Sequence, residues 1–205
     1  MCAGCIRAVD VAFLIDCSSP VDEDGSRAIT TAVANLLAKF DTSDYGTHFI
    51  QFRYGNTAEM IPPLRSYNGY NIYTTAVAGC GTTGRNLGAA FRAARRNFFF
   101  QGYPSSFESK TGDRLAVPDV VVVIAGGPST NSTEAVVEAD LLKTDGIKIV
   151  TIGVGPDADV TELSAISSNI TEARLFVVDE PDDVENLTPA LVASICDFPV
   201  EGRLT

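Results

Sequence analysis

The sequence has no tryptophan, one histidine and few positive charges. Its 15 Lys and Arg residues are outnumbered by 26 Asp and Glu residues, which leaves a net charge of -11. Nucleic-acid binding and docking on an anionic membrane both need a basic surface, so this charge argues against both. Apolar runs are also short, and none reaches the roughly 18 residues of a membrane-spanning helix. We therefore expect no nucleic-acid partner and no membrane span.

Catalytic residues are equally scarce. The one histidine, His48, lies within a predicted strand, and a Cys80–His48 pair would lack the third group that orients a catalytic base. No serine nucleophile motif is present. The sequence "GCGTTG" at 79–84 matches the Gly-x-Gly-x-x-Gly pattern of dinucleotide-binding enzymes and precedes a predicted helix. However, the residues before it make a poor buried strand, so we expect a protein that is not an enzyme, with a nucleotide-binding enzyme as a remote alternative.

Strand-like and helix-like segments alternate along the whole chain. The segments 9–16 ("VDVAFLID") and 118–127 ("PDVVVVIAGG") are almost entirely apolar, as strands buried on both faces should be. Pro62 and Pro63 place the segment 58–64 at a sheet edge, because proline cannot donate a ladder hydrogen bond. We expect further strands at 47–55, 147–155 and 174–179, and helices at 26–40, 84–98, 133–144, 159–168 and 184–196.

This alternation predicts an α/β fold with a doubly wound, mostly parallel central sheet, one short antiparallel edge strand and helices on both faces. The chain has 205 residues, of which 45% are hydrophobic, and this suits one domain over 1–205 with its core at about 9–196. The polar segment 99–117 is the one long loop, either an exposed insertion or a recognition loop.

Five cysteines and three glycosylation sequons point to an oxidising compartment. The sequons begin at Asn131, Asn169 and Asn186. The cysteine number is odd, so at least one thiol stays free or pairs between chains. Together these features favour a secreted glycoprotein.

One predicted helix carries a local basic stripe. Arg85, Arg92 and Arg96 fall near one face of the helix by their spacing. In so acidic a chain, this stripe is a candidate surface for binding an acidic partner or a sulfated glycan. The alternative is an ordinary solvated face whose arginines pair with nearby acids.

Several of these segments together resemble the von Willebrand factor A domain family. "DVAFLIDCSSPVDEDGSRAITTAVANLLAKF" is similar to the family's first strand, metal loop and first helix, and "IKIVTIGVGPDADVTELSAISS" is the most specific match. The resemblance covers roughly residues 9 to 196 and is nearest to matrix proteins such as matrilins, collagen VI chains and byssal or shell matrix proteins. It implies the same doubly wound fold and a non-catalytic binding role.

Members of this family often bind a divalent cation at the carboxyl ends of the strands, through oxygens from three loops. On this chain the first loop supplies Asp16 and Ser18, but then Pro20. The other two positions fall on Gly81, for which Thr82 could substitute, and on Gly126. A hard cation needs oxygen ligands, so we expect no tightly bound metal, with weak Mg²⁺ or Ca²⁺ binding as the alternative. We further expect Asp16 to lack a counter-ion and to accept hydrogen bonds from backbone N–H groups and from Ser18.

The resemblance also implies cysteine pairings. Cys17 and Cys80 lie in two loops that face each other in this fold, which suggests a disulfide; two buried thiols are the alternative. The termini of the fold lie close together, so Cys196 is expected to pair with Cys2 or Cys5. We thus predict a secreted, extracellular-matrix binding or assembly module whose partners are matrix proteins such as collagen or the chain itself, by homotypic or disulfide-linked assembly. A metal-dependent adhesion domain with a degenerate site is the runner-up.

Overall fold

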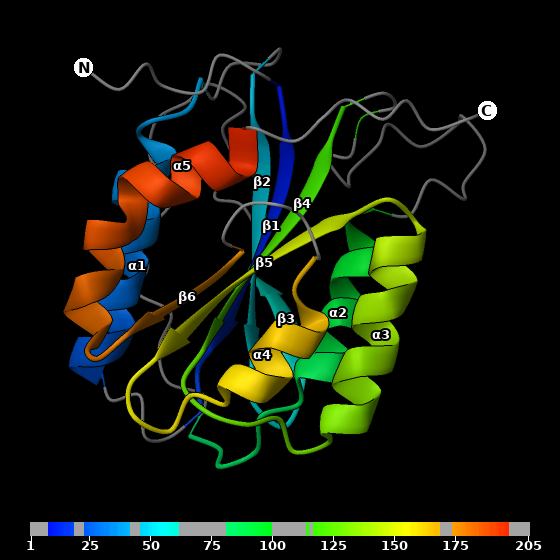
Figure 1. The fold of residues 1–205 in the computed structure, drawn as a ribbon, viewed down its shortest axis with the longest axis vertical. Helices are drawn as coiled ribbons and strands as arrows, with labels where there is room; N and C mark the ends of the chain where they lie inside the picture. Colours follow the sequence, from blue (N-terminus) through cyan, green and yellow to red (C-terminus); the bar gives the residue numbers. More distant parts are fainter. Residues whose placement is uncertain are drawn as a thin grey trace.

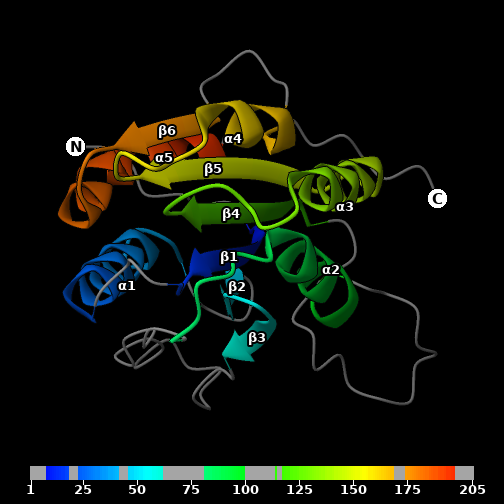
Figure 2. The same cartoon turned by 90° about the horizontal axis from the view of Figure 1, so that it is seen from below.

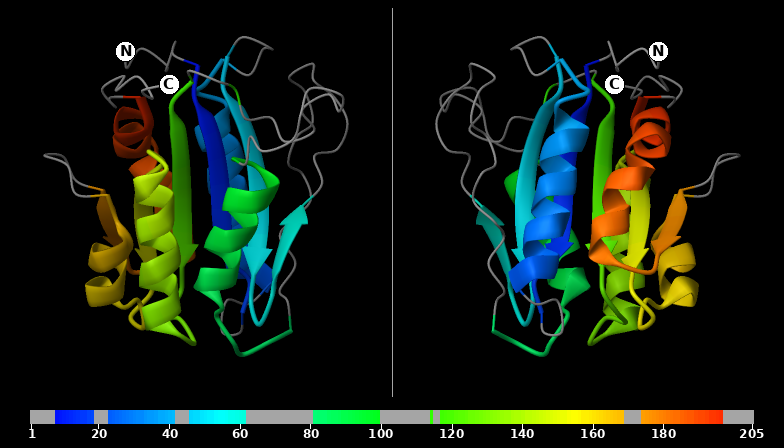
Figure 3. Two further views of the ribbon diagram at one scale, coloured as in Figure 1. Left: turned by 90° about the vertical axis from the view of Figure 1, so that its right-hand side faces the viewer. Right: turned by 90° about the vertical axis from the view of Figure 1, so that its left-hand side faces the viewer.

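A six-stranded sheet forms the centre of the computed structural model, which describes residues 8–18, 23–41, 46–61, 81–99, 114, 117–168 and 174–196. The strand order is β3-β2-β1-β4-β5-β6. All neighbours are parallel except β2 and β3, which are antiparallel, as the arrows in Figure 3 show. The strands are β1 (Asp10–Asp16), β2 (His48–Tyr54), β3 (Ala58–Ile61), β4 (Asp119–Ala125), β5 (Lys148–Val154) and β6 (Leu175–Val178). The predicted doubly wound, mostly parallel sheet with one antiparallel edge strand is confirmed.

Helices cover both faces of the sheet (Figure 1). One face carries α1 (Glu23–Leu37), the 3-10 helix η1 (Pro181–Leu187) and α5 (Thr188–Cys196). The other carries α2 (Leu87–Asn97), α3 (Ser132–Thr144) and α4 (Val160–Ile166). Figure 2 shows the two layers on either side of the strands. Among the helices described, none is both long and apolar enough to cross a bilayer.

The central strands are apolar because each contributes to two cores. In β1, Phe13 and Ile15 belong to the cluster under α1 and α5, whereas Ala12 and Leu14 belong to the cluster under α2 and α3. All seven residues of β1 and all seven of β4 are buried. A strand covered on both faces cannot alternate apolar with polar residues, which explains the continuous apolar runs in the sequence.

Helix α1 spans Glu23–Leu37, where the sequence predicts 26–40. Two further helices differ from their predicted bounds for identifiable reasons. Helix α2 begins at Leu87 rather than near Gly84, because the Asn86 side chain caps it by accepting a hydrogen bond from the N–H of Ala89. The predicted helix 184–196 is split into η1 and α5. Pro189 has no N–H to donate to the previous turn, and its ring would clash with the carbonyl of Glu185 in a continuous α-helix.

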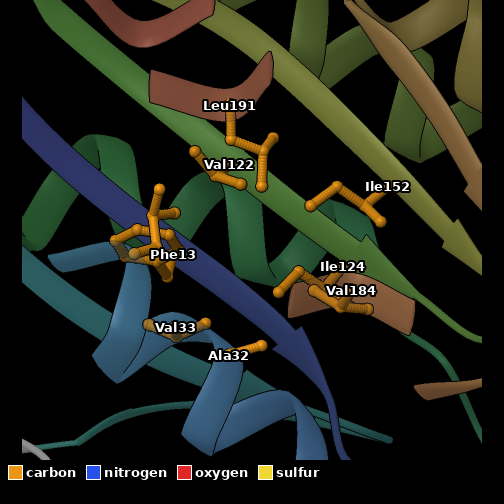
Figure 4. Close-up of a pocket in the computed structure, with 9 residues that line it drawn as sticks. Phe13, Ala32, Val33, Val122, Ile124, Ile152, Val184 and Leu191 are labelled. Carbon is orange, nitrogen blue, oxygen red and sulfur yellow. The ribbon is translucent and has the colours of Figure 1, made fainter. Parts of the chain in front are cut away.

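A small apolar cavity remains in the core between α1 and the sheet. Val184 of η1 and Leu191 of α5, which lie on the same face of the sheet as α1, also line it (Figure 4). Every residue that lines it has an apolar side chain, so no side chain could anchor a water inside it. The residues that line it are Phe13, Ala32, Val33, Leu36, Val122, Ile124, Ile152, Val184 and Leu191.

Candidate functional site

Asp16 is the centre of the polar cluster at the carboxyl end of the sheet. It ends β1, and it is only 2% exposed. Its Oδ1 accepts hydrogen bonds from the backbone N–H of Ser18 at 2.8 Å and from the Ser18 hydroxyl at 2.6 Å. Its Oδ2 accepts from the Arg85 Nε at 3.1 Å and from the Gly126 N–H at 3.1 Å. Three loops, which follow β1, precede α2 and follow β4, therefore meet at one carboxylate.

Arg85 is held in place by the loop that follows β4. Its backbone N–H donates to the Thr130 hydroxyl at 2.8 Å, and its carbonyl accepts from the Thr130 N–H at 2.9 Å. Its guanidinium lies against Gly127, where a Cβ would come within 2.9 Å of the Arg85 Cζ and Nη1. The Arg85 side chain can therefore pass over position 127 to reach Asp16 because the residue there, Gly127, has no side chain.

Buried Tyr54 and a second carboxylate, Glu162, lie near the Asp16–Arg85 pair. The Tyr54 hydroxyl donates to the carbonyl of Ile124 at 3.4 Å. Burial raises the pKa of Tyr54 well above its ordinary value, and the charges of Asp16 and Glu162 raise it further, whereas Arg85 lowers it. Tyr54 therefore stays a neutral hydrogen-bond donor. Glu162, on α4, accepts a hydrogen bond from the Ser129 N–H at 2.8 Å and so ties α4 to the loop after β4.

This arrangement does not fit a divalent cation. Both oxygens of Asp16 already accept hydrogen bonds, and one of them faces a guanidinium, whose positive charge would repel a metal ion. Gly126 contributes an N–H donor where a metal would need an oxygen. Within the described residues, no group of three His, Cys, Asp or Glu side chains could hold a metal ion.

Only part of the predicted metal-site set comes together. Asp16 and Ser18 are directly bonded, but the Thr82 hydroxyl instead accepts a hydrogen bond from the N–H of Asn56 at 3.3 Å. Gly81 has a φ of 63°, a left-handed conformation in which a side chain at this position would be strained. Pro20 lies outside the described residues.

The expectation that Asp16 lacks a counter-ion is wrong. The predicted neutral donors are present, since Ser18 and Gly126 both donate to Asp16. In addition, however, the guanidinium of Arg85 forms an ion pair with Asp16. The sequence carries one signal of this pair, namely an arginine directly after the second loop in a chain whose third loop has Gly126 in place of a carboxylate.

The predicted basic stripe consists of Arg85, which lies before α2, and of Arg92 and Arg96 within α2, and it is largely paired with acids. Arg85 contacts Asp16, and Arg92 forms ion pairs with Glu134 and Glu138 of α3. Hydrogen bonds from these two glutamates raise the pKa of the Arg92 guanidinium above its ordinary value. Pairing with nearby acids, the alternative reading of the stripe, therefore describes these two arginines. Arg96 is exposed, and a role of the three residues in partner binding stays a prediction.

Of the five cysteines, the structure describes Cys17 and Cys196. Neither Cys17 nor Cys196 is a free thiol. Their predicted partners, Cys80 and either Cys2 or Cys5, lie outside the described residues, so both pairings stay predictions.

The glycine motif "GCGTTG" does not open directly into a helix. A Cβ on Gly84, its last residue, would collide with the Asn56 side chain. Because α2 begins only at Leu87, its free N–H groups lie beyond the glycines, which weakens the dinucleotide alternative.

Two of the three sequons lie on described surface. Asn131 is exposed and caps α3 by accepting a hydrogen bond from the Glu134 N–H at 3.1 Å. Asn186 is exposed in η1, and its amide donates to Asp183 at 3.2 Å. Asn169 lies outside the described residues. Glycosylation at all three stays a prediction.

A second buried ion pair, which sequence reasoning missed, lies at the amino end of the sheet. Asp10 begins β1 and is fully buried. It accepts hydrogen bonds from the Arg114 Nη2 at 2.6 Å, Nε at 3.0 Å and backbone N–H at 2.7 Å. His48 Nδ1 lies 3.9 Å from the same carboxylate. His48 therefore lies at the end of the sheet opposite Asp16.

Comparison with known proteins identifies the family. The family model described as von Willebrand factor type A domain matches residues 10–190. Vitrin from Bos taurus is 25% identical over 194 residues, which cover 94% of this chain and 28% of vitrin. The collagen alpha-6(VI) chain from Homo sapiens is 23% identical over 194 residues, which cover 94% of this chain and 8% of that protein. The chain thus spans about a quarter of vitrin and much less of the collagen chain.

Solved structures show the same fold. Proximal thread matrix protein 1 from the mussel byssus superposes with a TM-score of 0.75 at 20% identity, over 95% of this chain and 47% of that one. A structure of the same mussel protein with a zinc-occupied MIDAS motif, the metal-ion-dependent adhesion site, gives a TM-score of 0.72 at 20% identity, over the same shares of the two chains. From the family match over most of its length, this chain belongs to the von Willebrand factor type A domain family.

Proposed function

We propose that this chain is a non-catalytic binding or assembly module of a secreted extracellular-matrix or adhesion protein, and that it works without a bound metal ion. Its relatives include vitrin, collagen VI and cochlin. The described residues bring no nucleophile, base and orienting group together at the carboxyl end of the sheet. The matrix setting also agrees with the three sequons and five cysteines of the sequence.

The observation that carries the metal-independent part is the hydrogen bonding of Asp16. A metal would have to displace the Arg85 guanidinium and two donors from Ser18. It would gain few ligands in return, because Gly81 and Gly126 have no side-chain oxygen. The mussel byssus protein, by contrast, has been seen with zinc in its MIDAS motif. A metal-dependent adhesion domain with a degenerate site is therefore the second candidate function for this chain.

Matrix proteins are the proposed partners, with collagen and a second copy of the chain as the first to test. The net charge of -11 favours partners with a basic or neutral surface over acidic ones. Cysteines beyond those in internal pairs would allow disulfide-linked assembly, since the cysteine number is odd.

The test is binding measured with and without metal. Immobilised fibrillar collagen and an immobilised second copy of the chain serve as targets, and binding is compared in EDTA, in Mg²⁺ and in Mn²⁺. We expect the same affinity in all three conditions. Binding that is lost in EDTA and restored by Mg²⁺ would favour the second candidate. Binding to neither target in any condition would argue against an assembly role with these partners.

A further inference from the structure

We propose that Arg85 is the resident cation of this domain, occupying by its side chain the place at which a metal ion would otherwise neutralise Asp16. The inference rests on the proposed metal-independent function and names the residue that makes it work. It also predicts that removing Arg85 exposes a latent divalent-cation site.

The first support is the geometry around Asp16. The carboxylate is 2% exposed, and a buried charge of this kind is unstable unless it is paired and hydrogen-bonded. Among the described residues, the Arg85 Nε at 3.1 Å is the one charged donor that it meets, and the other donors come from Ser18 and Gly126. Asp16 therefore depends on Arg85 for its charge balance.

The second support is that contacts with residues other than Asp16 fix the position of Arg85. Its backbone forms two hydrogen bonds with Thr130, and its guanidinium rests on Gly127. The Arg85 side chain is 16% exposed, so it lies in the cluster and not out in solvent. As a metal would, Arg85 joins the loop after β1 to the segment before α2 and to the loop after β4.

The third step concerns charge. A divalent ion beside one carboxylate leaves a net charge of +1, which attracts an acidic side chain of a partner. A guanidinium beside one carboxylate leaves a net charge of zero. Glu162 adds a negative charge close enough to raise the Tyr54 pKa, so the cluster as a whole has no excess positive charge. A partner that docks at this end of the sheet does not anchor through a carboxylate.

The experiment compares four proteins by thermal unfolding in EDTA and in rising concentrations of Mn²⁺. They are the parent, Arg85→Ala, the double variant Arg85→Ala/Asp16→Asn, and, as a control, Arg96→Ala, which removes an exposed arginine of the helix that follows Arg85. In EDTA, Arg85→Ala should melt roughly 6 to 20 °C below the parent, because Asp16 is left buried without a counter-ion. The double variant should recover part of this loss, and Arg96→Ala should melt like the parent.

Mn²⁺ supplies the decisive comparison. It should raise the melting temperature of Arg85→Ala in a saturable manner and leave the parent, the double variant and Arg96→Ala unchanged. A further variant, Arg85→Ala/Gly126→Asp, restores a second carboxylate and should respond at lower Mn²⁺ concentration. Arg85→Gln, which keeps a hydrogen-bond donor, takes the place of Arg85→Ala if that variant does not fold.

Two outcomes would overturn the inference, and they are distinguishable. If the parent shows the same saturable Mn²⁺ response as Arg85→Ala, Arg85 does not occupy the cation's place, and the metal-independent function fails with it. If the parent is insensitive to Mn²⁺ but neither Arg85→Ala nor Arg85→Ala/Gly126→Asp gains a response, Arg85 is not a substitute for a metal, although the proposed function stands.

Discussion

Each end of β1 carries a buried aspartate that is paired with an arginine, but the two sites are built differently. The strand begins with Asp10 and ends with Asp16, and both carboxylates are buried in the sheet. Each is paired with an arginine from a distant part of the chain, Arg114 at the amino end and Arg85 at the carboxyl end. The two ion pairs differ in how many donors the arginine supplies and in what else the carboxylate contacts.

At the amino end, a single residue, Arg114, donates three hydrogen bonds to the Asp10 carboxylate. Arg114 donates to Asp10 through two side-chain nitrogens and its backbone N–H, so this one residue satisfies both oxygens of the carboxylate. At the carboxyl end, Arg85 donates once, and Ser18 and Gly126 supply the other donors. The amino-end pair fixes one segment, whereas the carboxyl-end cluster joins three loops, as a metal site does.

The largest effect is expected from Arg114→Ala. It would remove both side-chain donors and leave the buried Asp10 with His48, whose Nδ1 lies 3.9 Å away, as the remaining basic group beside it among the described residues. Loss of one partner from a buried ion pair costs about 3 to 5 kcal/mol. Denaturant unfolding at neutral pH should show a free energy of unfolding lower by this amount. A loss below about 1 kcal/mol would mean that Asp10 finds other donors.

Asp10→Asn should be milder, and its cost should depend on pH. Burial raises the pKa of Asp10 above its ordinary value of 3.8, although the hydrogen bond and charge of Arg114 and the charge of His48 oppose the shift. The folded protein therefore holds a proton on Asp10 more tightly than the unfolded chain does. This contribution to stability is fully present below pH 3.8 and is lost as the pH rises through the raised pKa.

Asn at position 10 cannot titrate, so the stability advantage of the parent over Asp10→Asn should shrink as the pH rises from below 3.8 towards neutrality. Urea unfolding of both proteins at a series of pH values measures this difference. An advantage that grows with pH would show that the ion pair outweighs burial and would contradict the raised pKa.

Gly127→Ala probes the carboxyl end without removing any charge. A Cβ here would lie 2.9 Å from the Arg85 Cζ and Nη1, so the guanidinium would have to move away from Asp16. Weakening one charge-assisted hydrogen bond costs about 1.5 to 3 kcal/mol. We expect a loss near the lower end of that range, because the side chain can shift. The same substitution at Gly146, with open space around its Cβ but a φ of 84°, is a control for backbone strain alone.

Arg92→Gln should give a smaller effect that salt abolishes. Arg92 joins α2 to α3 through Glu134 and Glu138, but its side chain is 34% exposed, unlike Asp10 or Asp16. Partly exposed ion pairs contribute about 0.2 to 1 kcal/mol and are screened by salt. The loss measured at low ionic strength should therefore shrink at high ionic strength. A loss that salt leaves unchanged would place this pair with the buried ones.

The sheet could be predicted from the sequence because its physics is local. Continuous apolar runs such as 9–16 and 118–127 report burial on both faces, and the two prolines after β3 mark an edge. The break before α5 was also readable, since Pro189 cannot continue an α-helix that starts at 184.

The two arginine–aspartate pairs could not be predicted in this way. Arg114 meets Asp10 across 104 residues of sequence and Arg85 meets Asp16 across 69, so neither pair leaves a periodic pattern. Charge alone does not choose between Arg85, Arg92 and Arg96, because the sequence places all three near one face of a single predicted helix. In the structure Arg85 lies before α2, and its backbone hydrogen bonds to Thr130 and its packing on Gly127 place it beside Asp16.

Val122→Ile is the smallest change, and it tests the middle of the sheet against its two polar ends. Val122 lines the small apolar cavity between α1, η1, α5 and the strands (Figure 4). One added methylene that fits the cavity should raise the free energy of unfolding by about 0.8 kcal/mol, and one that does not fit should lower it by about 1 kcal/mol or more. Because the residues that line the cavity all have apolar side chains, the gain should be the same at every pH and salt concentration. Denaturant unfolding of the parent and the variant across both series measures this. A gain that varies with pH would show that the core and the ion pairs at the ends of β1 are coupled.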